Sequence, residues 1–289
     1  MDLLGELRMD AGEFFRHAEE NRVDSAYALR RELAGMVIYE EPIFAVADAG
    51  DPLFEGLKQA TAIGPHFLTP VEWLASAQTV LAYFLPFSEP VRRSNRSHPC
   101  HPSTEWQHGR IEGELMNTAF RRYLVRWLNE RSYDAMIPGD DPRYQVQEPV
   151  SSNWSERHAA FIAGLGTFGM SKGLITEKGI AGRVGTVITS ALLPVTPRPY
   201  RDLYEYCSRC GACAKRCPAG AITPGSDLHV CKSNVVCGEF LQPLKDLSAA
   251  GGDTRPLEEQ DDYRPEKMRV RFGCGKCQVG VPCEKQIPK

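Results

Sequence analysis

Four closely spaced cysteines near residue 210 constrain this chain more than any other feature. They form the run Cys207-x2-Cys210-x2-Cys213-x3-Cys217, followed directly by Pro218. Three thiolates on one tight loop can bind three irons of a [4Fe–4S] cube, and the fourth cysteine, on the next turn, is directed toward a second cube. The run therefore predicts two [4Fe–4S] clusters.

Two other uses of these cysteines are less favoured. Nine of the ten cysteines lie from Cys207 onward, and Cys100 is the exception. Disulfides belong to exported chains, and the segment from Met1 to Arg8 lacks the basic region and apolar run of a secretory signal. Structural zinc usually takes its ligands as two separated pairs, so a third cysteine two residues after a pair would be surplus.

The remaining cysteines supply the other ligands. We expect Cys217 and Cys231, with the pair Cys274-x2-Cys277, to bind the second cluster. We expect Cys283 to complete the first cluster beside Cys207, Cys210 and Cys213. Cys237 competes with Cys283 for that place, and the cysteine that is not used would be a buried thiol.

Composition limits the partners and the compartment. The chain has 289 residues and a net charge of -3, so no global positive field would attract nucleic acid or an anionic membrane. No stretch of the sequence is apolar over the length of a membrane span. We expect a cytoplasmic protein that recognises its partners through local sites.

Apolar periodicity predicts an α/β domain over residues 1–200 and a small cluster-binding domain over residues 201–289. The expected helices cover 12–20 and 111–128, with a third capped at Ser151–Asn153 and closed by Gly164. The expected strands cover 35–39, 43–47, 79–87 and 184–193, and the run at 79–87 suits a buried central strand that ends at Pro86. Prolines at 194, 197 and 199 form a linker to the cysteine-rich region.

Three segments resemble the epoxyqueuosine reductase family, whose members are cobalamin-dependent iron–sulfur enzymes related to reductive dehalogenases. They are the run from Ser155 to Gly169, the strand at 184–190, and the block at 207–222 with its Cys-Pro-Ala-Gly-Ala-Ile. The resemblance implies an α/β (α+β, nitroreductase-like) corrinoid-binding domain followed by a two-cluster ferredoxin-like domain. It also implies that Cys231 is the lone cysteine between the two cysteine blocks, and that Arg157 lies near the cofactor.

This chain departs from the family pattern at two places. The family aspartate that donates a proton lies seven residues before the arginine of the Glu-Arg pair, and here that position is Val150, which cannot donate a proton. The candidate replacements are Glu148, Tyr144 and Asp141, with the neighbouring Asp140. The last cysteine, Cys283, comes two positions later than in the family. A divergent subgroup is indicated, whose substrate need not be a tRNA base.

The sequence also contains two weaker patterns. Gly164-x-Gly166-x-x-Gly169 matches a dinucleotide fingerprint but follows a helix instead of a strand, so it predicts either a helix end with a tight turn or a close approach of the backbone to a cofactor. The second pattern is a histidine- and cysteine-containing loop, at His98, Cys100, His101 and His108. The spacing of these residues is only a weak signal for a metal site. The loop is instead a candidate lining for the substrate or cofactor cavity.

Two functional hypotheses follow. In the first, the protein is an oxidoreductase whose clusters take electrons from a soluble one-electron donor, of the ferredoxin or flavodoxin type, and pass them to a corrinoid that reduces a small-molecule or nucleoside-like substrate. In the second, it is a ferredoxin-like electron-transfer protein without corrinoid chemistry, or with flavin in its N-terminal domain. Against the second stands the large N-terminal domain, which a pure electron carrier would not need.

Overall fold

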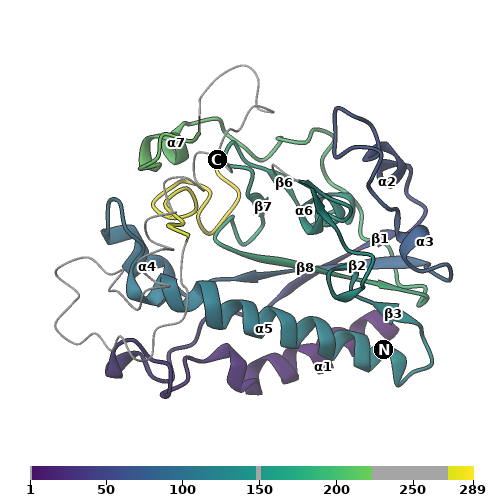
Figure 1. Ribbon diagram of the computed structural model, residues 1–289, viewed down its shortest axis with the longest axis horizontal. Helices are drawn as coiled ribbons and strands as arrows, with labels where there is room; N and C mark the ends of the chain where they lie inside the picture. The colour runs from purple at the N-terminus through teal and green to yellow at the C-terminus, as the bar shows by residue number, and fades with distance from the viewer. Residues whose placement is uncertain (1, 148–150, 223–272) are drawn as a thin grey trace.

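The computed structural model describes residues 2–147, 151–222 and 273–289, and Figure 1 shows its arrangement. The central sheet has the order β1-β2-β8-β3, and all of its neighbouring strands are antiparallel. Its strands are β1 (Ile43–Asp48), β2 (Thr79–Pro86), β3 (Ala135–Met136) and β8 (Gly182–Thr189). Two short hairpins pair β4 (Val146–Gln147) with β5 (Ser151–Ser152) and β6 (Gly166–Phe168) with β7 (Leu174–Thr176).

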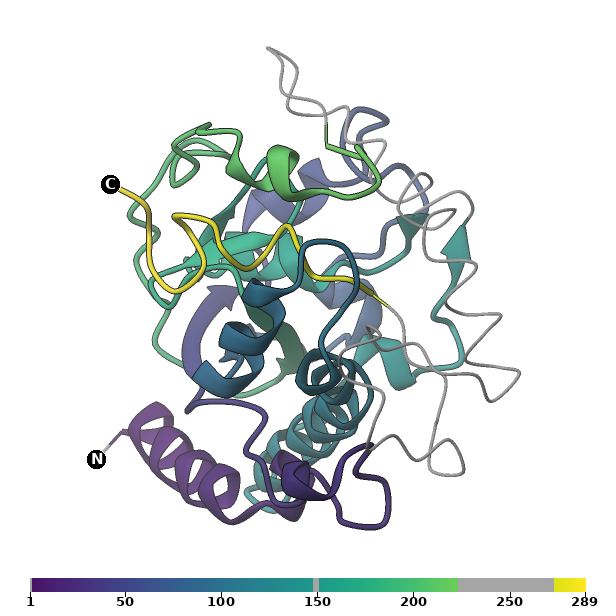
Figure 2. The same ribbon diagram turned by 90° about the vertical axis from the view of Figure 1, so that its left-hand side faces the viewer.

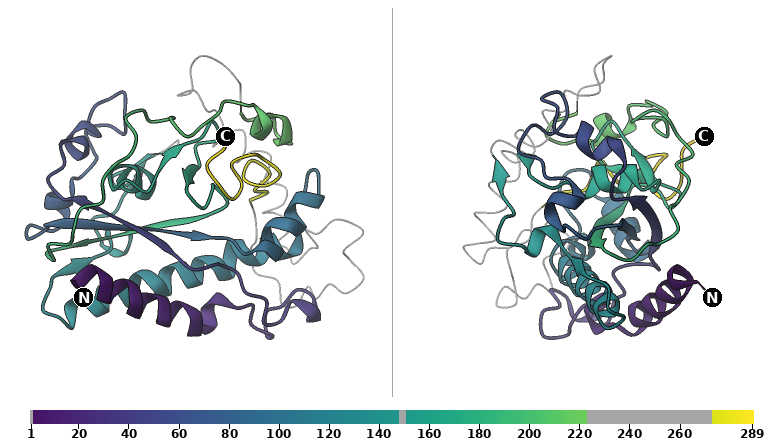
Figure 3. Two further views of the ribbon diagram at one scale, coloured as in Figure 1. Left: turned by 180° about the vertical axis from the view of Figure 1, so that it is seen from behind. Right: turned by 90° about the vertical axis from the view of Figure 1, so that its right-hand side faces the viewer.

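Helices cover both faces of the sheet, as Figures 1 and 3 show. One face packs against α1 (Leu3–His17) and α5 (Thr104–Asn129), and the other packs against α2 (Pro52–Gly56), α3 (Pro70–Trp73) and α6 (Glu156–Ile162). The remaining helices are α4 (Glu89–Ser97), α7 (Ala212–Arg216) and the 3-10 turns Glu19–Asn21, Arg31–Leu33 and Pro138–Asp140.

The strand at 79–87 is the central strand that its apolar run predicts. All eight residues of β2 are buried, because Leu81, Tyr83 and Leu85 face the α1 and α5 layer whereas Val80 and Phe84 face the opposite layer. The predicted helix at 111–128 is also present within α5, and its buried row runs through Met116, Phe120, Leu124 and Leu128.

Three element predictions need correction. The segment 35–39 is not a strand, because Val37 and Tyr39 make isolated bridges to two different partners and no continuous ladder forms. The first helix begins at Leu3, where the Asp2 side chain accepts a hydrogen bond from the Gly5 N–H at 2.7 Å, and it ends at His17. The predicted cap at 151–153 is wrong, since Ser151 and Ser152 pair in β5.

The linker to the cysteine-rich region follows the free edge of β1. The Thr196 N–H donates to the Val46 carbonyl at 2.9 Å, and the Val46 N–H donates to Thr196 Oγ1 at 3.0 Å. The chain then crosses to the opposite end of the sheet, where residues 273–289 lie between α7 and α4 (Figure 2). Described residues from both parts share hydrophobic clusters, among them Tyr204 and Val279. The division at residue 200 stays a prediction. No helix in the described ranges has the length and apolarity that crossing a membrane requires.

Candidate metal centres and the adjoining basic site

The first cysteine set lines one small, largely apolar pocket. Cys207, Cys210, Cys213 and Cys283 border it together with Ile175 and Ile180. The loop turns tightly because Arg209 and Gly211 adopt left-handed conformations, with φ of 52° and 72°. Cys283 comes from the far end of the chain and is held there by its carbonyl, which accepts a hydrogen bond from the Ile180 N–H at 2.8 Å.

Electrostatics in this pocket suit a cationic iron cluster. Burial, together with the negative charge of the neighbouring cysteines, raises the pKa of Cys213 to about 11 and that of Cys283 to about 12. Thiolates that repel one another are stabilised by bound iron, which displaces their protons. The four residues therefore fit a [4Fe–4S] cluster by their chemistry and their common pocket. The competing Cys237 lies outside the described residues.

The second cysteine set is formed by Cys217, at the end of α7, with Cys274 and Cys277. Cys217 and Cys277 pack against the same hydrophobic cluster. Burial raises the pKa of the Cys274 thiol, nearby Cys217 raises it further, and the positive charge of Lys276 opposes the rise. Cys231, the predicted fourth ligand, lies outside the described residues.

No arrangement for a single metal ion appears among the described His, Cys, Asp and Glu side chains. A cube of four irons holds its thiolates farther apart than one ion does, so this observation bears on mononuclear sites alone. The loop pattern at 98–108 is not such a site. Cys100 is exposed, whereas His108 is buried in α5, where its Nε2 accepts a hydrogen bond from the Leu29 N–H and its Nδ1 contacts Glu112.

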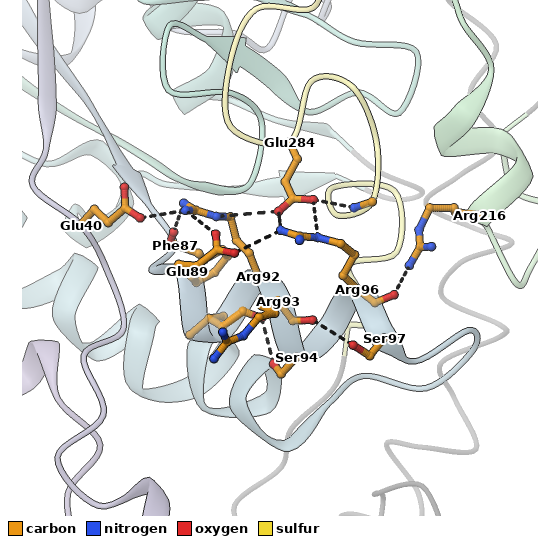
Figure 4. Close-up of polar contacts among 12 residues, drawn as sticks. Glu40, Phe87, Glu89, Arg92, Arg93, Ser94, Arg96, Ser97, Arg216 and Glu284 are labelled. Carbon is orange, nitrogen blue, oxygen red and sulfur yellow. Dashed lines mark hydrogen bonds and ion pairs between the residues drawn. The ribbon is translucent and has the colours of Figure 1, made fainter.

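Helix α4 holds the C-terminal cysteine loop through ion pairs, which Figure 4 shows. The buried carboxylate of Glu284 accepts hydrogen bonds from Arg96 Nη2 at 2.5 Å and from the Gly280 N–H at 2.6 Å, and Arg92 Nε lies 3.8 Å away. Arg216, the last residue of α7, donates to the Arg96 carbonyl at 3.2 Å. The two cysteine-bearing segments thus share one docking helix.

Helices α4 and α5 also hydrogen-bond to the backbone at the pair Cys274-x2-Cys277. The Asn95 side-chain amide donates to the Cys274 carbonyl at 2.9 Å, and the Trp106 indole donates to the Gly273 carbonyl at 2.9 Å. Gly275, with φ of 62°, packs so closely on the Trp106 ring that an added Cβ would lie 2.0 Å from it. The role of α4 was not predicted from the sequence, although its many Arg, Asn and Ser residues, next to an apolar strand, were an available signal.

Three arginines gather beside the second cysteine set. Arg157 at the start of α6 lies within electrostatic reach of Cys277 and of Arg183, and it donates to the Lys172 carbonyl at 2.8 Å. Arg183 of β8 donates to the Arg110 carbonyl at 3.3 Å. Burial, with the repulsion of Arg183, lowers the pKa of Arg110 to about 10. We call Arg110, Arg157 and Arg183 the basic site.

The predicted glycines have different surroundings. Gly164, with φ of 90°, ends α6 against the Pro197 carbonyl, as the tight-turn interpretation expects. An added Cβ on Gly166 would lie 2.1 Å from the Ile175 carbonyl oxygen of the paired strand. Gly169 lines the pocket of the first cysteine set. A direct cofactor contact of these glycines stays a prediction.

The candidate proton donors that the structure describes are not grouped with the cysteines. Asp140 and Asp141 follow β3, at the end of α5 opposite the cysteine loops (Figure 1). The Arg143 guanidinium contacts both carboxylate oxygens of Asp141 at 2.9 Å and lowers its pKa, which keeps it ionised and disfavours it as a proton donor. Tyr144 is exposed, and Glu148 lies outside the described residues.

Two titratable residues of α6 were missed by sequence analysis. Burial raises the pKa of Glu156, whose carboxylate accepts a hydrogen bond from the Thr186 hydroxyl at 2.5 Å, and this marks Glu156 as a candidate proton donor. Burial and the adjacent Arg157 lower the pKa of His158 to about 4. Glu156 and His158 flank Arg157 near the start of a half-buried helix, and this position was the sequence signal for them.

His158 is expected to make the protein acid-sensitive. Its folded-state pKa of about 4 lies below the unfolded value near 6.5, so the unfolded chain binds more protons between these values. The contribution of neutral His158 to the free energy of unfolding is therefore fully present above about pH 6.5. It falls by up to about 3 kcal/mol as the pH drops toward 4. Urea unfolding at pH 7 and pH 5 should show a smaller loss in His158→Gln than in wild type, whereas exposed His17→Gln should match wild type. An equal loss of stability in His158→Gln and in His17→Gln would contradict the low folded-state pKa of His158.

Part of the chain is similar in sequence to known iron–sulfur proteins. Residues 202–223 match the family of 4Fe-4S binding domains. Epoxyqueuosine reductase of Francisella cf. novicida (strain Fx1) is 30% identical over 138 residues, which cover 46% of this chain and 33% of that protein. The Bacillus cereus enzyme of the same name is 27% identical over 146 residues, which cover 50% and 33% of the two chains. The matches thus span one third of each curated relative.

Solved structures show the same fold. Epoxyqueuosine reductase from Bacillus subtilis superposes with a TM-score of 0.51 at 18% identity, covering 99% of this chain and 66% of that one. An epoxyqueuosine reductase in complex with a modified tRNA stem loop gives a TM-score of 0.50 at 18% identity, covering 99% and 67%. The chain is thus similar in part of its sequence and in its fold to epoxyqueuosine reductases.

Proposed function

We propose that this protein is an iron–sulfur oxidoreductase that passes electrons singly through two [4Fe–4S] clusters to a corrinoid centre, where a small or nucleoside-like substrate is reduced. The observation that supports this most is the position of Arg157 within electrostatic reach of Cys277. This position supports an electron path from the second cysteine set to the segment that resembles the epoxyqueuosine reductase family.

The proposed organisation has a nitroreductase-like domain over residues 1–200 and a two-cluster domain over 201–289. A soluble ferredoxin or flavodoxin would reduce the first cluster, because Cys210 is exposed whereas Cys274 is buried. Two clusters can hold one electron each, which suits a two-electron reduction that is fed by one-electron donors.

The basic site suits the anionic groups of a corrinoid or of a nucleotide substrate. Within the described residues, the Nε of Arg183 is buried and has no hydrogen-bond partner, which leaves a donor for a ligand. A bound corrinoid would supply the cobalt chemistry, and Arg157 and Arg183 would orient it while Glu156 holds a proton. The tRNA stem loop bound to a solved relative supports a nucleoside-containing substrate class.

Cobalamin titration of the anaerobically reconstituted chain tests this function. We expect a change in the cobalt absorption spectrum, and binding about tenfold weaker in Arg157→Gln because one charged hydrogen bond is lost. Exposed Arg201→Gln is the matched control and should bind like wild type. An unchanged cobalt spectrum in the wild-type chain would overturn the corrinoid centre and leave the clusters in place.

One observation favours the alternative, an electron-transfer protein without corrinoid or with flavin. An added Cβ on Gly164 or Gly166 would approach protein backbone, so packing within the chain accounts for both glycines without a bound corrinoid. Titration with flavin mononucleotide under the same conditions distinguishes the two functions. Flavin binding with an unchanged cobalt spectrum would favour the alternative.

A further inference from the structure

Positive charge is concentrated on the two cysteine-bearing segments. In their described parts, 207–222 and 273–289, the one acid is Glu284, and the basic residues are Arg209, Lys215, Arg216, Lys276, Lys285 and Lys289. Glu284 is buried and is bound by Arg96, so its charge is neutralised inside the protein. The whole chain has a net charge of -3, and its excess of acids therefore lies outside these two segments.

Three of these basic residues, Arg209, Lys215 and Lys285, are exposed, and each lies within two residues of a cysteine that is predicted to bind a cluster. The two segments that carry them touch, because an added Cβ on Gly280 would lie 2.8 Å from the guanidinium carbon of Arg216. Figures 1 and 2 show α7 beside the C-terminal segment. We call Arg209, Lys215 and Lys285 the outer patch.

Two acids border the outer patch near Tyr206. Burial, together with the negative charges of Glu205 and Glu177, raises the pKa of Tyr206, which places both acids near this ring. The Glu205 carboxylate accepts hydrogen bonds from two backbone N–H groups at 2.8 and 3.2 Å, and exposed Lys178 directly follows Glu177. The described surface around the cysteine loops therefore keeps an excess of positive charge.

The same surface gives a second protein access to the first cysteine set. Cys210 is exposed, whereas Cys274 of the second set is buried. Ser208 and Pro282, which are also exposed and adjoin the first cysteine set, have small side chains. A redox centre of another protein can therefore approach the first set without displacing a large side chain.

We propose that the outer patch is the docking surface for an acidic one-electron carrier protein of the flavodoxin or ferredoxin class. This inference rests on the proposed function, in which electrons enter at the first cluster. Negative charges on the carrier are attracted to the patch, which speeds the encounter and orients the carrier over Cys210. One electron passes from the carrier, which is oxidised, to the first cluster, which is reduced, and no bond forms or breaks. A carrier is favoured over nucleic acid because the positive residues adjoin a predicted redox centre.

The test measures how fast a reduced flavodoxin of net negative charge bleaches the clusters of the anaerobically reconstituted full chain in stopped flow. At low ionic strength we expect Lys215→Gln/Lys285→Gln to react about tenfold more slowly than wild type, because two attractive charges are lost. The difference should vanish at about 1 M salt, where exposed charges are screened. Lys215→Arg/Lys285→Arg keeps both charges and should react like wild type.

Arg8→Gln/Arg126→Gln is the matched control, because it removes the same net charge from exposed positions on α1 and α5. It should react like wild type. Photoreduced 5-deazariboflavin, a small uncharged reductant, should bleach the clusters of every variant at the wild-type rate. This second measurement separates slower docking from damage to the clusters.

An unchanged flavodoxin rate in Lys215→Gln/Lys285→Gln, or an equal slowing in the matched control, overturns the docking surface. A stem-loop RNA that loses affinity for this variant while the flavodoxin rate stays unchanged assigns the patch to nucleic acid and also overturns it. A wild-type chain that loads no cluster refutes the proposed electron transfer and this inference with it. An unchanged cobalt spectrum refutes only the corrinoid centre, because bleaching of the clusters needs no corrinoid.

Discussion

Replacing Cys217 with alanine is expected to remove about half of the iron and acid-labile sulfide from the reconstituted protein. Cys217 lies close enough to Cys274 to raise its pKa, and it is absent from the residues that line the pocket of Cys207, Cys210 and Cys213. In the Cys-x2-Cys-x2-Cys-x3-Cys-Pro run the fourth cysteine ligates the other cluster, so the first cluster should remain. Iron and sulfide analysis of the purified variant measures this.

Cys100→Ala is the control for this experiment, because Cys100 is exposed and lies outside the cysteine-rich segment. It should retain all of the iron. Complete loss of iron in Cys217→Ala, or retention of the full amount, would contradict the division of the cysteines into two sets.

Glu284→Ala is expected to destabilise the protein by about 1–3 kcal/mol and to speed the loss of the first cluster. The variant leaves the nearly buried Arg92 without this carboxylate and removes the acceptor of the Gly280 N–H. Cys283 directly precedes Glu284, so its loop should open more often and expose the cluster to solvent. Urea unfolding gives the stability, and bleaching of the cluster absorption gives the rate.

Glu89→Ala is the matched control. Glu89 also pairs with Arg92 and Arg96, but its side chain is 47% exposed, and exposed ion pairs contribute only about 0–1 kcal/mol. If the two variants lost equal stability and bleached at equal rates, the buried position of Glu284 would have no special role.

Local patterns explain the predictions that the structure confirms. The buried strand at 79–86 and the helix through Met116, Phe120 and Leu124 follow from apolar spacing within one element. The strand predicted at 35–39 failed for the complementary reason, because a short apolar run becomes a strand only where a neighbouring strand supplies a ladder. The Asp141 prediction also depended on a partner that the sequence does not reveal, namely Arg143.

The cysteine chemistry was determined by the sequence alone. Cys207, Cys210, Cys213 and Cys217 lie within eleven residues, so the spacing of neighbouring thiolates is a local property of the backbone. Only the tertiary structure brought Cys283 to the first three, docked both cysteine segments on α4, and buried Lys276 beside Cys274. These contacts join residues that are far apart in the chain, and their position follows from the packing of whole elements and not from any local period.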